Sequence, residues 1–453
     1  MAQDRRGIDR DRLTSLHRQE ADRFAERTPK SRELYRRGRK LMPHGVPQAW
    51  MAGFYPDTPI YVREGSGACF IDVDGNSYLD MSQCDLSMSC GYGPPAVCEA
   101  VVRQFRAGSH FLLPTEDALA VCGHLTQRFG LPFWQFTLSA SGANTEAIRL
   151  ARLATGRDRV LIFAGKYHGH IDDTLVQDMA GSLAAESLGL PKSVVDRATV
   201  IPFNDLAALD DALSCGDIAC VLAEPVMTNI GVILPDDGYH AALRGLTRRH
   251  GTLLFIDETH TQVAVFGGFT RLWSLEPDIL TIGKSLGGGI PIGAYGLSEP
   301  LARLMEDHLE LQMEGEPGLA VGGTTYGNAL GLAAARAALE RVLTREGYER
   351  IAGLGQRLAD GIDDLIARRK LPWRAYRLGN RSGICLSPVW PRNAAEFQDI
   401  VDLELSHATR VFMANRGIWE PIVIHGPSLS FAHEARHVDR YLTAIEELID
   451  AVT

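Results

Sequence analysis

A short apolar run ends in a lysine and a cluster of glycines in the stretch Pro277-Asp278-Ile279-Leu280-Thr281-Ile282-Gly283-Lys284-Ser285-Leu286-Gly287-Gly288-Gly289. The run predicts a buried strand, and the glycines end it. Burial away from carboxylates disfavours the charged form of a lysine and leaves a more nucleophilic amine, suited to forming a Schiff base. Lys284 is therefore a candidate nucleophile, and the alternative is a solvated lysine at a strand end.

Other lysines and another motif compete with this interpretation. Lys166, in a loop, is the weaker rival among the few lysines of the chain, which are Lys30, Lys40, Lys166, Lys192, Lys284 and Lys370. A P-loop carries its first glycine five residues before the glycine-lysine pair. That position is Asp278, and here the glycines follow the lysine, so the sequence excludes an ATPase of this type.

Composition limits the class of protein. A chain of 453 residues that is 45% hydrophobic can form one large domain and one or two smaller ones. The net charge of -10 argues against nucleic acid as the main partner. The 8 cysteines form no C-x-x-C pair, which predicts reduced thiols and a cytoplasmic protein without a zinc site. No apolar run approaches the length of about 18 residues that a membrane helix needs.

The order of apolar patterns predicts an α/β protein. From residue 95 helices alternate with short strands, which is typical of a mostly parallel sheet covered by helices on both faces. The expected strands are 135–138, 159–163, 218–223, 252–256, 279–282 and 292–295. Outside this region we expect short strands near 383–386 and 422–424 and a closing helix over 435–452. The expected divisions are an N-terminal helical segment (1–42), the first part of a small domain (43–94), a large domain (95–327) and a C-terminal small domain (328–453).

Side chains able to bind a ligand follow four of these strands. In parallel sheets ligands bind beyond the carboxyl ends of the strands. The segments are Ser139–Asn144, Tyr167, Glu224 and Asp257–His260. Ser139 and the small residues after it begin a helix, so this turn is either an anion site or an ordinary N-cap. The ring of Tyr167 is able to stack on a ligand, although packing is the common role of a single aromatic residue there.

Asp257 and Lys284 together suggest pyridoxal 5′-phosphate (PLP). This cofactor needs a lysine for its Schiff base and an acid that keeps its ring nitrogen protonated, and the turn at Ser139 would hold its phosphate. A metal site built from His168, His170, Asp257 and His260 is the weaker alternative, because it leaves the lysine and glycine stretch unexplained.

The sequence resembles the class III, fold type I PLP-dependent aminotransferases, in the branch near glutamate-1-semialdehyde aminomutase and the β-amino-acid and amine transaminases. The resemblance covers roughly residues 40–450. It implies a large domain with a mostly parallel seven-stranded sheet and a small α+β domain made by the N- and C-terminal segments. The motifs that carry it are Asp72–Asn76, Ser139–Asn144, Ile148–Arg152, Thr155–Arg157, Tyr167–Gly169, Glu224–Pro225, Asp257–Glu258, Pro277–Asp278, Gly283–Lys284, Gly323–Thr324 and Gly327–Asn328.

The resemblance also implies roles for individual residues in a homodimer with shared active sites. Lys284 is the Schiff-base lysine and proton shuttle, and Asp257 pairs with the ring nitrogen. Tyr167 and Thr259 cover the two faces of the ring, and Thr324 reaches the phosphate of the neighbouring subunit. The cofactor-binding set is thus expected to be Ser139, Ala140, Ser141, Tyr167, Glu224, Asp257, Thr259, Lys284 and Thr324.

One departure from the family concerns the substrate. Met51 stands where aminomutase-like proteins carry an arginine that binds the substrate carboxylate. Methionine cannot donate the paired hydrogen bonds that a carboxylate needs. We therefore expect an aminotransferase that takes the amino group of an amine or amino acid and gives it to a keto acid by a ping-pong mechanism. Candidate substrate contacts are Trp50, Asp85 and His425.

Three other functions stay open. A 1,2-aminomutase of the glutamate-1-semialdehyde type is the first, and the missing arginine disfavours it. An epimerase or decarboxylase on the same cofactor is the second. A non-catalytic binding protein with the same fold is the third, although such a protein has no need for both Lys284 and Asp257.

Overall fold

The computed structural model describes residues 4–54, 59–179, 181–308, 318–421 and 426–453. Two compact units make up the chain. The first contains Met1–Pro94, Glu349–Val389 and Ile400–Thr453, and the second contains Pro95–Tyr348 and Trp390–Asp399. The second unit starts where the large domain was expected to start. It continues to Tyr348, beyond the expected end at residue 327, because α11 (Ala329–Arg341) packs against α4 and α5 of the same unit.

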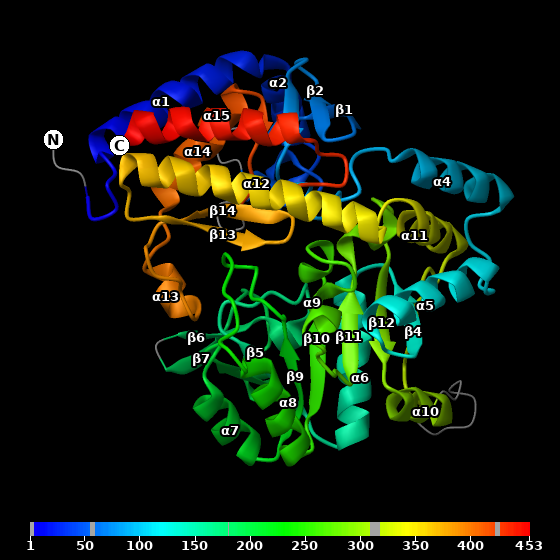
Figure 1. Cartoon of the computed structure of the whole chain (residues 1–453). Coiled ribbons are helices and arrows are strands. Elements are labelled where there is room, and N and C mark those ends of the chain that lie inside the picture. The colour runs from blue at the N-terminus through cyan, green and yellow to red at the C-terminus, as the bar shows by residue number, and fades with distance from the viewer. Residues whose placement is uncertain (1–3, 55–58, 180, 309–317, 422–425) are drawn as a thin grey trace. The chain divides into compact units, whose positions relative to one another are not determined.

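A seven-stranded sheet forms the centre of the second unit (Figure 1). Strand β12 runs antiparallel to both of its neighbours, β4 and β11, whereas β11, β10, β9, β5 and β8 pair in parallel. The expected mostly parallel sheet is therefore confirmed. In spatial order the strands are β4 (Phe133–Thr137), β12 (Gly293–Leu297), β11 (Ile279–Ile282), β10 (Leu253–Asp257), β9 (Ile218–Ala223), β5 (Arg159–Phe163) and β8 (Ala198–Ile201).

Apolar sequence explains why these segments form the inner strands. Every residue of β9 and of β11 is buried, as expected for strands covered on both faces. Helix α6 packs against β4, β9, β11 and β12, and α8 packs against β10. The helices of this unit are α4 (Pro95–Ala107), α5 (Glu116–Phe129), α6 (Ala140–Thr155), α7 (Leu206–Ser214), α8 (Tyr239–His250), α9 (Gly268–Leu272), α10 (Glu299–Asp307), α11 and α13 (Ala394–Gln398), and a hairpin pairs β6 (Val176–Met179) with β7 (Ser182–Ala185).

The first unit combines a four-stranded sheet with helices. The sheet has the order β1-β2-β3-β15, and β13 and β14 form a separate hairpin. The strands are β1 (Val62–Ser66), β2 (Cys69–Asp72), β3 (Ser77–Asp80), β13 (Arg374–Leu378), β14 (Arg381–Cys385) and β15 (Ile418–Trp419). The helices are α1 (Arg10–Arg27), α2 (Pro29–Gly38), α3 (Trp50–Phe54), α12 (Arg345–Arg369, beginning in the second unit), α14 (Leu403–Asn415) and α15 (Ala435–Val452). The strand expected at 422–424 lies outside the described residues.

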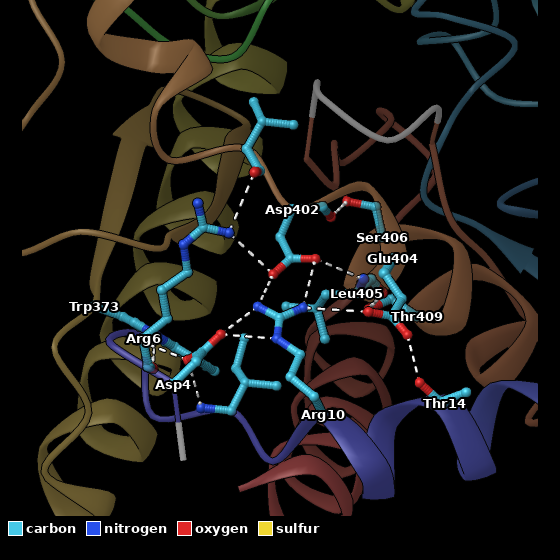
Figure 2. A network of polar contacts seen from close by, with 12 residues as sticks. Asp4, Arg6, Arg10, Thr14, Trp373, Asp402, Glu404, Leu405, Ser406 and Thr409 are labelled. Atoms are coloured by element: carbon cyan, nitrogen blue, oxygen red, sulfur yellow. Dashed lines mark hydrogen bonds and ion pairs between the residues drawn. The ribbon is translucent and has the colours of Figure 1, made fainter. Parts of the chain in front are cut away.

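The N-terminal segment is part of the core of the first unit. Ile8 and Leu13 are fully buried in the same cluster as residues of α12, α14 and α15. Two arginines bind the carboxylate of Asp402: Arg6, which precedes α1, and Arg10, the first residue of α1 (Figure 2). Nη1 of Arg6 lies 3.0 Å from Oδ2 of Asp402, and Nη1 of Arg10 lies 3.2 Å from Oδ1. Asp402 also caps α14 by accepting a hydrogen bond from Leu405 N. These contacts attach the start of the chain to α14.

Among the described residues, no helix has both the length and the apolar character needed to cross a membrane.

Candidate active site

Asp257 and Lys284 lie at the same edge of the sheet, at the ends of two neighbouring strands. Asp257 is the last residue of β10, and Lys284 comes two residues after the end of β11. The two strands are parallel neighbours, with Asp257 opposite Thr281. The expectation that both residues stand at the carboxyl ends of strands in one sheet is confirmed, and those strands are adjacent.

Asp257 is held by three hydrogen-bond donors. Oδ2 lies 2.9 Å from Nδ1 of His168 and 3.1 Å from Nδ2 of Asn144, and Oδ1 accepts a hydrogen bond of 3.0 Å from the backbone of Thr259. Burial raises the pKa of Asp257, but the hydrogen bond and the charge of His168 outweigh it and, with Thr259, lower the pKa to about 2. The carboxylate is therefore ionised at neutral pH although it is only 4% exposed.

Lys284 stands in a constrained piece of backbone. Its φ of 45° is left-handed, which is uncommon for a residue with a side chain and is frequent at functional sites. The preceding residue, Gly283, accepts a hydrogen bond of 2.8 Å from Nε2 of Gln262. A Cβ at Gly283 would lie 3.1 Å from the backbone nitrogen of Ala140, so the end of β11 packs against the start of α6.

The start of α6 forms the expected turn. Ser139 is the N-cap, and its Oγ accepts a hydrogen bond of 3.2 Å from Gly142 N. Oγ of Ser141 accepts a hydrogen bond of 3.1 Å from His170 N, which leaves its own hydrogen available to a ligand. A Cβ at Gly293 would come within 2.4 Å of the carbonyl carbon of Ser139, so only glycine fits there. The anion site and the N-cap, considered as alternatives from sequence, are compatible in one turn.

The other expected cofactor residues of this unit have different environments. Tyr167 is 42% exposed and Thr324 is also exposed, whereas Thr259 is half-buried beside Asp257. Glu224 follows β9 directly and is buried. Lys166, the rival lysine, is buried, donates a hydrogen bond of 2.9 Å to the carbonyl of Val176 and pairs with Glu186. That pairing gives Lys166 a structural role.

The expected substrate residues belong to the first unit or lie outside the described residues. Trp50 begins α3 and is 43% exposed. Asp85 is half-buried with a φ of 55°, within a left-handed run of four residues without glycine, Gln83–Leu86. His425 lies outside the described residues. Their contact with a substrate stays a prediction.

Two residues next to Asp257 had no such role assigned from sequence. His168 follows Tyr167, and its side chain is fully buried against Asp257. Asn144, in α6, joins the two by donating hydrogen bonds to Asp257 and to the carbonyl of His168, the latter of 2.9 Å. In the sequence, only the position of these two residues shortly after expected strands indicates that they lie near the site.

The metal alternative gains no support, because no cluster of three or more potential ligands is found among the described residues.

Comparison with known proteins identifies the family. The family model described as aminotransferase class-III matches residues 51–389. The chain belongs to the class-III aminotransferases. Glutamate-1-semialdehyde 2,1-aminomutase from Thermoplasma volcanium is 31% identical to this class-III aminotransferase, over 92% of this chain and 99% of that protein.

Solved structures of similar proteins agree with this family. A glutamate-1-semialdehyde-aminomutase variant from Pseudomonas aeruginosa, solved in complex with PMP, has a TM-score of 0.92 and 36% identity, covering 99% of this chain and 100% of that chain. An omega-transaminase from Sphaerobacter thermophilus has a TM-score of 0.85 and 29% identity, covering 94% and 99%. The fold is that of the fold type I PLP-dependent enzymes, and this class-III aminotransferase is a PLP-dependent enzyme.

Proposed function

We propose that this class-III aminotransferase moves an amino group from an amine or amino acid to a keto acid, with PLP bound at Lys284. The observation that carries the proposal is an ionised, buried carboxylate, Asp257, at the end of the strand next to that of Lys284. The two sides of a pyridine ring require such a pair: an acid that stays charged and an amine able to exchange with the substrate amine.

The residues at this sheet edge fit PLP. The first turn of α6 offers backbone N–H groups and the positive end of the helix dipole to a phosphate. The hydroxyl hydrogen of Ser141 would add a donor, while Ser139 keeps the helix capped. The glycines at 283 and 293 allow the turn to approach the sheet closely. These contacts would hold the phosphate.

The chemistry follows from what each side chain would do. When bound, PLP supplies an electron-accepting ring that stabilises negative charge at the substrate carbon. Asp257 would keep the ring nitrogen protonated, because His168 holds the carboxylate in its ionised form. Lys284 would take and return the proton at the substrate carbon. Tyr167 would cover one face of the ring and exclude water there.

The proposal of a transaminase and not an aminomutase depends on the residues expected to bind the substrate. The segment Gly45–Met51 contains no arginine, and Met51 stands where aminomutase-like proteins carry the carboxylate-binding arginine. A donor held without that arginine is an amine, or an amino acid bound by other groups. The second candidate function is the 1,2-aminomutase, which is favoured by the names of the most similar relatives.

A donor screen separates the two functions. Purified holoenzyme is given a panel of amines, β-amino acids and glutamate 1-semialdehyde, each with and without pyruvate or 2-oxoglutarate. The proposal predicts carbonyl products only when a keto acid is added, with the added keto acid converted to its amino acid. Efficient isomerisation of glutamate 1-semialdehyde without any keto acid would establish the aminomutase instead. Met51→Arg should move preference toward carboxylate-bearing donors.

We also propose a homodimer that shares its active sites. Large apolar side chains are exposed on and between α4 and α5, and such patches are typical of protein interfaces. Thr324, exposed just before α11, would reach the phosphate site of the second subunit. Sedimentation should give the mass of a dimer. The double variant Leu112→Asp, Leu113→Asp should give monomers that bind PLP weakly. The exposed residues are Phe105, Phe111, Leu112, Leu113 and Leu119.

The thiols support the expected cytoplasmic location, which we keep as a proposal. None of the eight cysteines forms a disulfide bond. Burial raises the pKa of Cys90 and Cys220 to about 12, so these thiols are poor nucleophiles for disulfide exchange. Fractionation of the native host cells tests the location directly.

A further inference from the structure

A second buried carboxyl lies near the pair formed by Asp257 and His168. One oxygen of Glu224, Oε2, accepts hydrogen bonds from the backbone and hydroxyl of Thr228, at 3.0 Å and 2.6 Å. The other oxygen, Oε1, is buried and has no hydrogen-bond partner among the described residues. Glu224 is only 5% exposed, so bulk water does not compensate this oxygen.

His168 has a matching gap. Its Nδ1 must carry a hydrogen, because it faces the ionised carboxylate of Asp257 at 2.9 Å. Its Nε2 is buried and has no partner in the part of the chain that the structure describes. Burial raises the pKa of Glu224, the charge of His168 lowers it, and the charge of Asp257 raises it again. Glu224 directly follows β9, the strand between β10, which ends at Asp257, and β5, which precedes His168, so the three side chains lie at one edge of the sheet.

We propose that a buried water molecule bridges Nε2 of His168 and Oε1 of Glu224, and that Glu224 is a positioning residue acting on Asp257 through this bridge. The water satisfies two buried polar atoms that otherwise have no partner, which is the usual role of internal water. The polar chain then runs from Asp257 through His168, the water and Glu224 to Thr228, whose Oγ1 lies 3.1 Å from Nδ1 of His260.

Two other titratable groups, His260 and His240, lie near this series of hydrogen-bonded side chains. Nδ1 of His260 lies 3.1 Å from Oγ1 of Thr228, which donates a hydrogen bond to Glu224. Nε2 of His240, from α8, lies 2.7 Å from the carbonyl of Pro225. Burial lowers the pKa of His240, so this side chain is a neutral hydrogen-bond donor to that carbonyl. Among the described residues, the charges of His168 and Asp257 act on the pKa of Glu224.

A high-resolution crystal structure of the holoenzyme tests the bridge. The proposal expects one ordered water within hydrogen-bond distance of both Nε2 of His168 and Oε1 of Glu224. It is overturned if the two atoms contact each other directly, lie too far apart to share a water, or face a dry space. This readout does not depend on the donor or on turnover, so the transaminase proposal can fail while the bridge stands.

Spectroscopy tests the influence of Glu224 on the cofactor. Glu224→Gln keeps the shape but cannot become negative at high pH, so the pH midpoint of the absorbance change of bound PLP should fall by about one unit. The matched control is Glu146→Gln, another buried glutamate of this unit, which accepts hydrogen bonds from Tyr295 and Gly322. An unchanged midpoint in Glu224→Gln, or an equal shift in the control, would overturn the proposal.

Discussion

Nδ1 of His168 lies 2.9 Å from Oδ2 of Asp257, and both side chains are buried. Without this contact burial would favour the neutral acid, and the carboxylate would lose the charge that a protonated ring nitrogen needs. The contact joins a strand end, β10, to the loop after β5, two strands away in the same sheet. It is thus a product of the fold and not of local sequence.

Replacing His168 should weaken the use of the cofactor. His168→Asn keeps a hydrogen-bond donor but removes the imidazole that offsets the effect of burial, so the pKa of Asp257 rises. A smaller ionised fraction of Asp257 supports the protonated ring nitrogen less well, and kcat/KM should fall by about tenfold. His170→Asn, at an exposed position two residues later, is the control and should stay near wild type. Equal activities in the two variants would argue against a role for His168.

Acid should destabilise the protein partly through Asp257. Its pKa is lowered in the folded state, so its ionised form contributes stability that is fully present above the ordinary pKa of 3.8 and is lost as the pH falls toward about 2. Asp257→Asn cannot titrate and should lose less stability over this range. Denaturant unfolding at several pH values measures the slopes. Parallel curves for the two proteins would show that the Asp257 carboxylate is not the group responsible.

A methyl group at residue 293 should disrupt the phosphate turn. The Cβ of Gly293→Ala would lie 2.4 Å from the carbonyl carbon of Ser139, and backbone must move to relieve the overlap. We expect a loss of about 1–3 kcal/mol in unfolding free energy together with weaker PLP binding. Gly123→Ala in α5 is the control, because nothing lies within 4 Å of its added Cβ. That change should leave stability unchanged or raise it by up to about 1 kcal/mol.

The network in Figure 2 should stabilise the first unit. Asp402→Asn keeps the cap of α14 but removes the charge shared by Arg6 and Arg10. We expect a loss of about 1 kcal/mol, less at high salt, because the arginines are partly exposed. Asp205→Asn, at the N-cap of α7, is the matched control. Limited proteolysis should release the N-terminal residues faster in Asp402→Asn, and equal rates in both variants would contradict the attachment.

Much of the fold could be predicted because short apolar runs mark buried strands. The strands at 159–163, 218–223 and 279–282 and the helix at 435–452 have the predicted bounds. The site residues at strand ends followed from the rule on parallel sheets, and the adjacency of Asp257 and Lys284 agrees with it.

Other features depend on tertiary contacts that no local pattern reveals. The left-handed run at Gln83–Leu86 could not be predicted from the sequence, because the run contains no glycine. The sequence predicts that the second small-domain segment begins at residue 328, whereas α11 belongs to the large unit, because it packs against α4 and α5. The partners of Asp257 come from α6 and from the loop after β5, so they appear only in the folded chain.

The most direct test of the central claim is to find where PLP attaches. Reduction of the purified holoenzyme with borohydride, followed by peptide mapping, should place a single pyridoxyl group on Lys284, and Asp257→Asn should retain that attachment while its absorbance loses the wild-type pH dependence. A pyridoxyl group on Lys166, or on no lysine at all, would contradict the account.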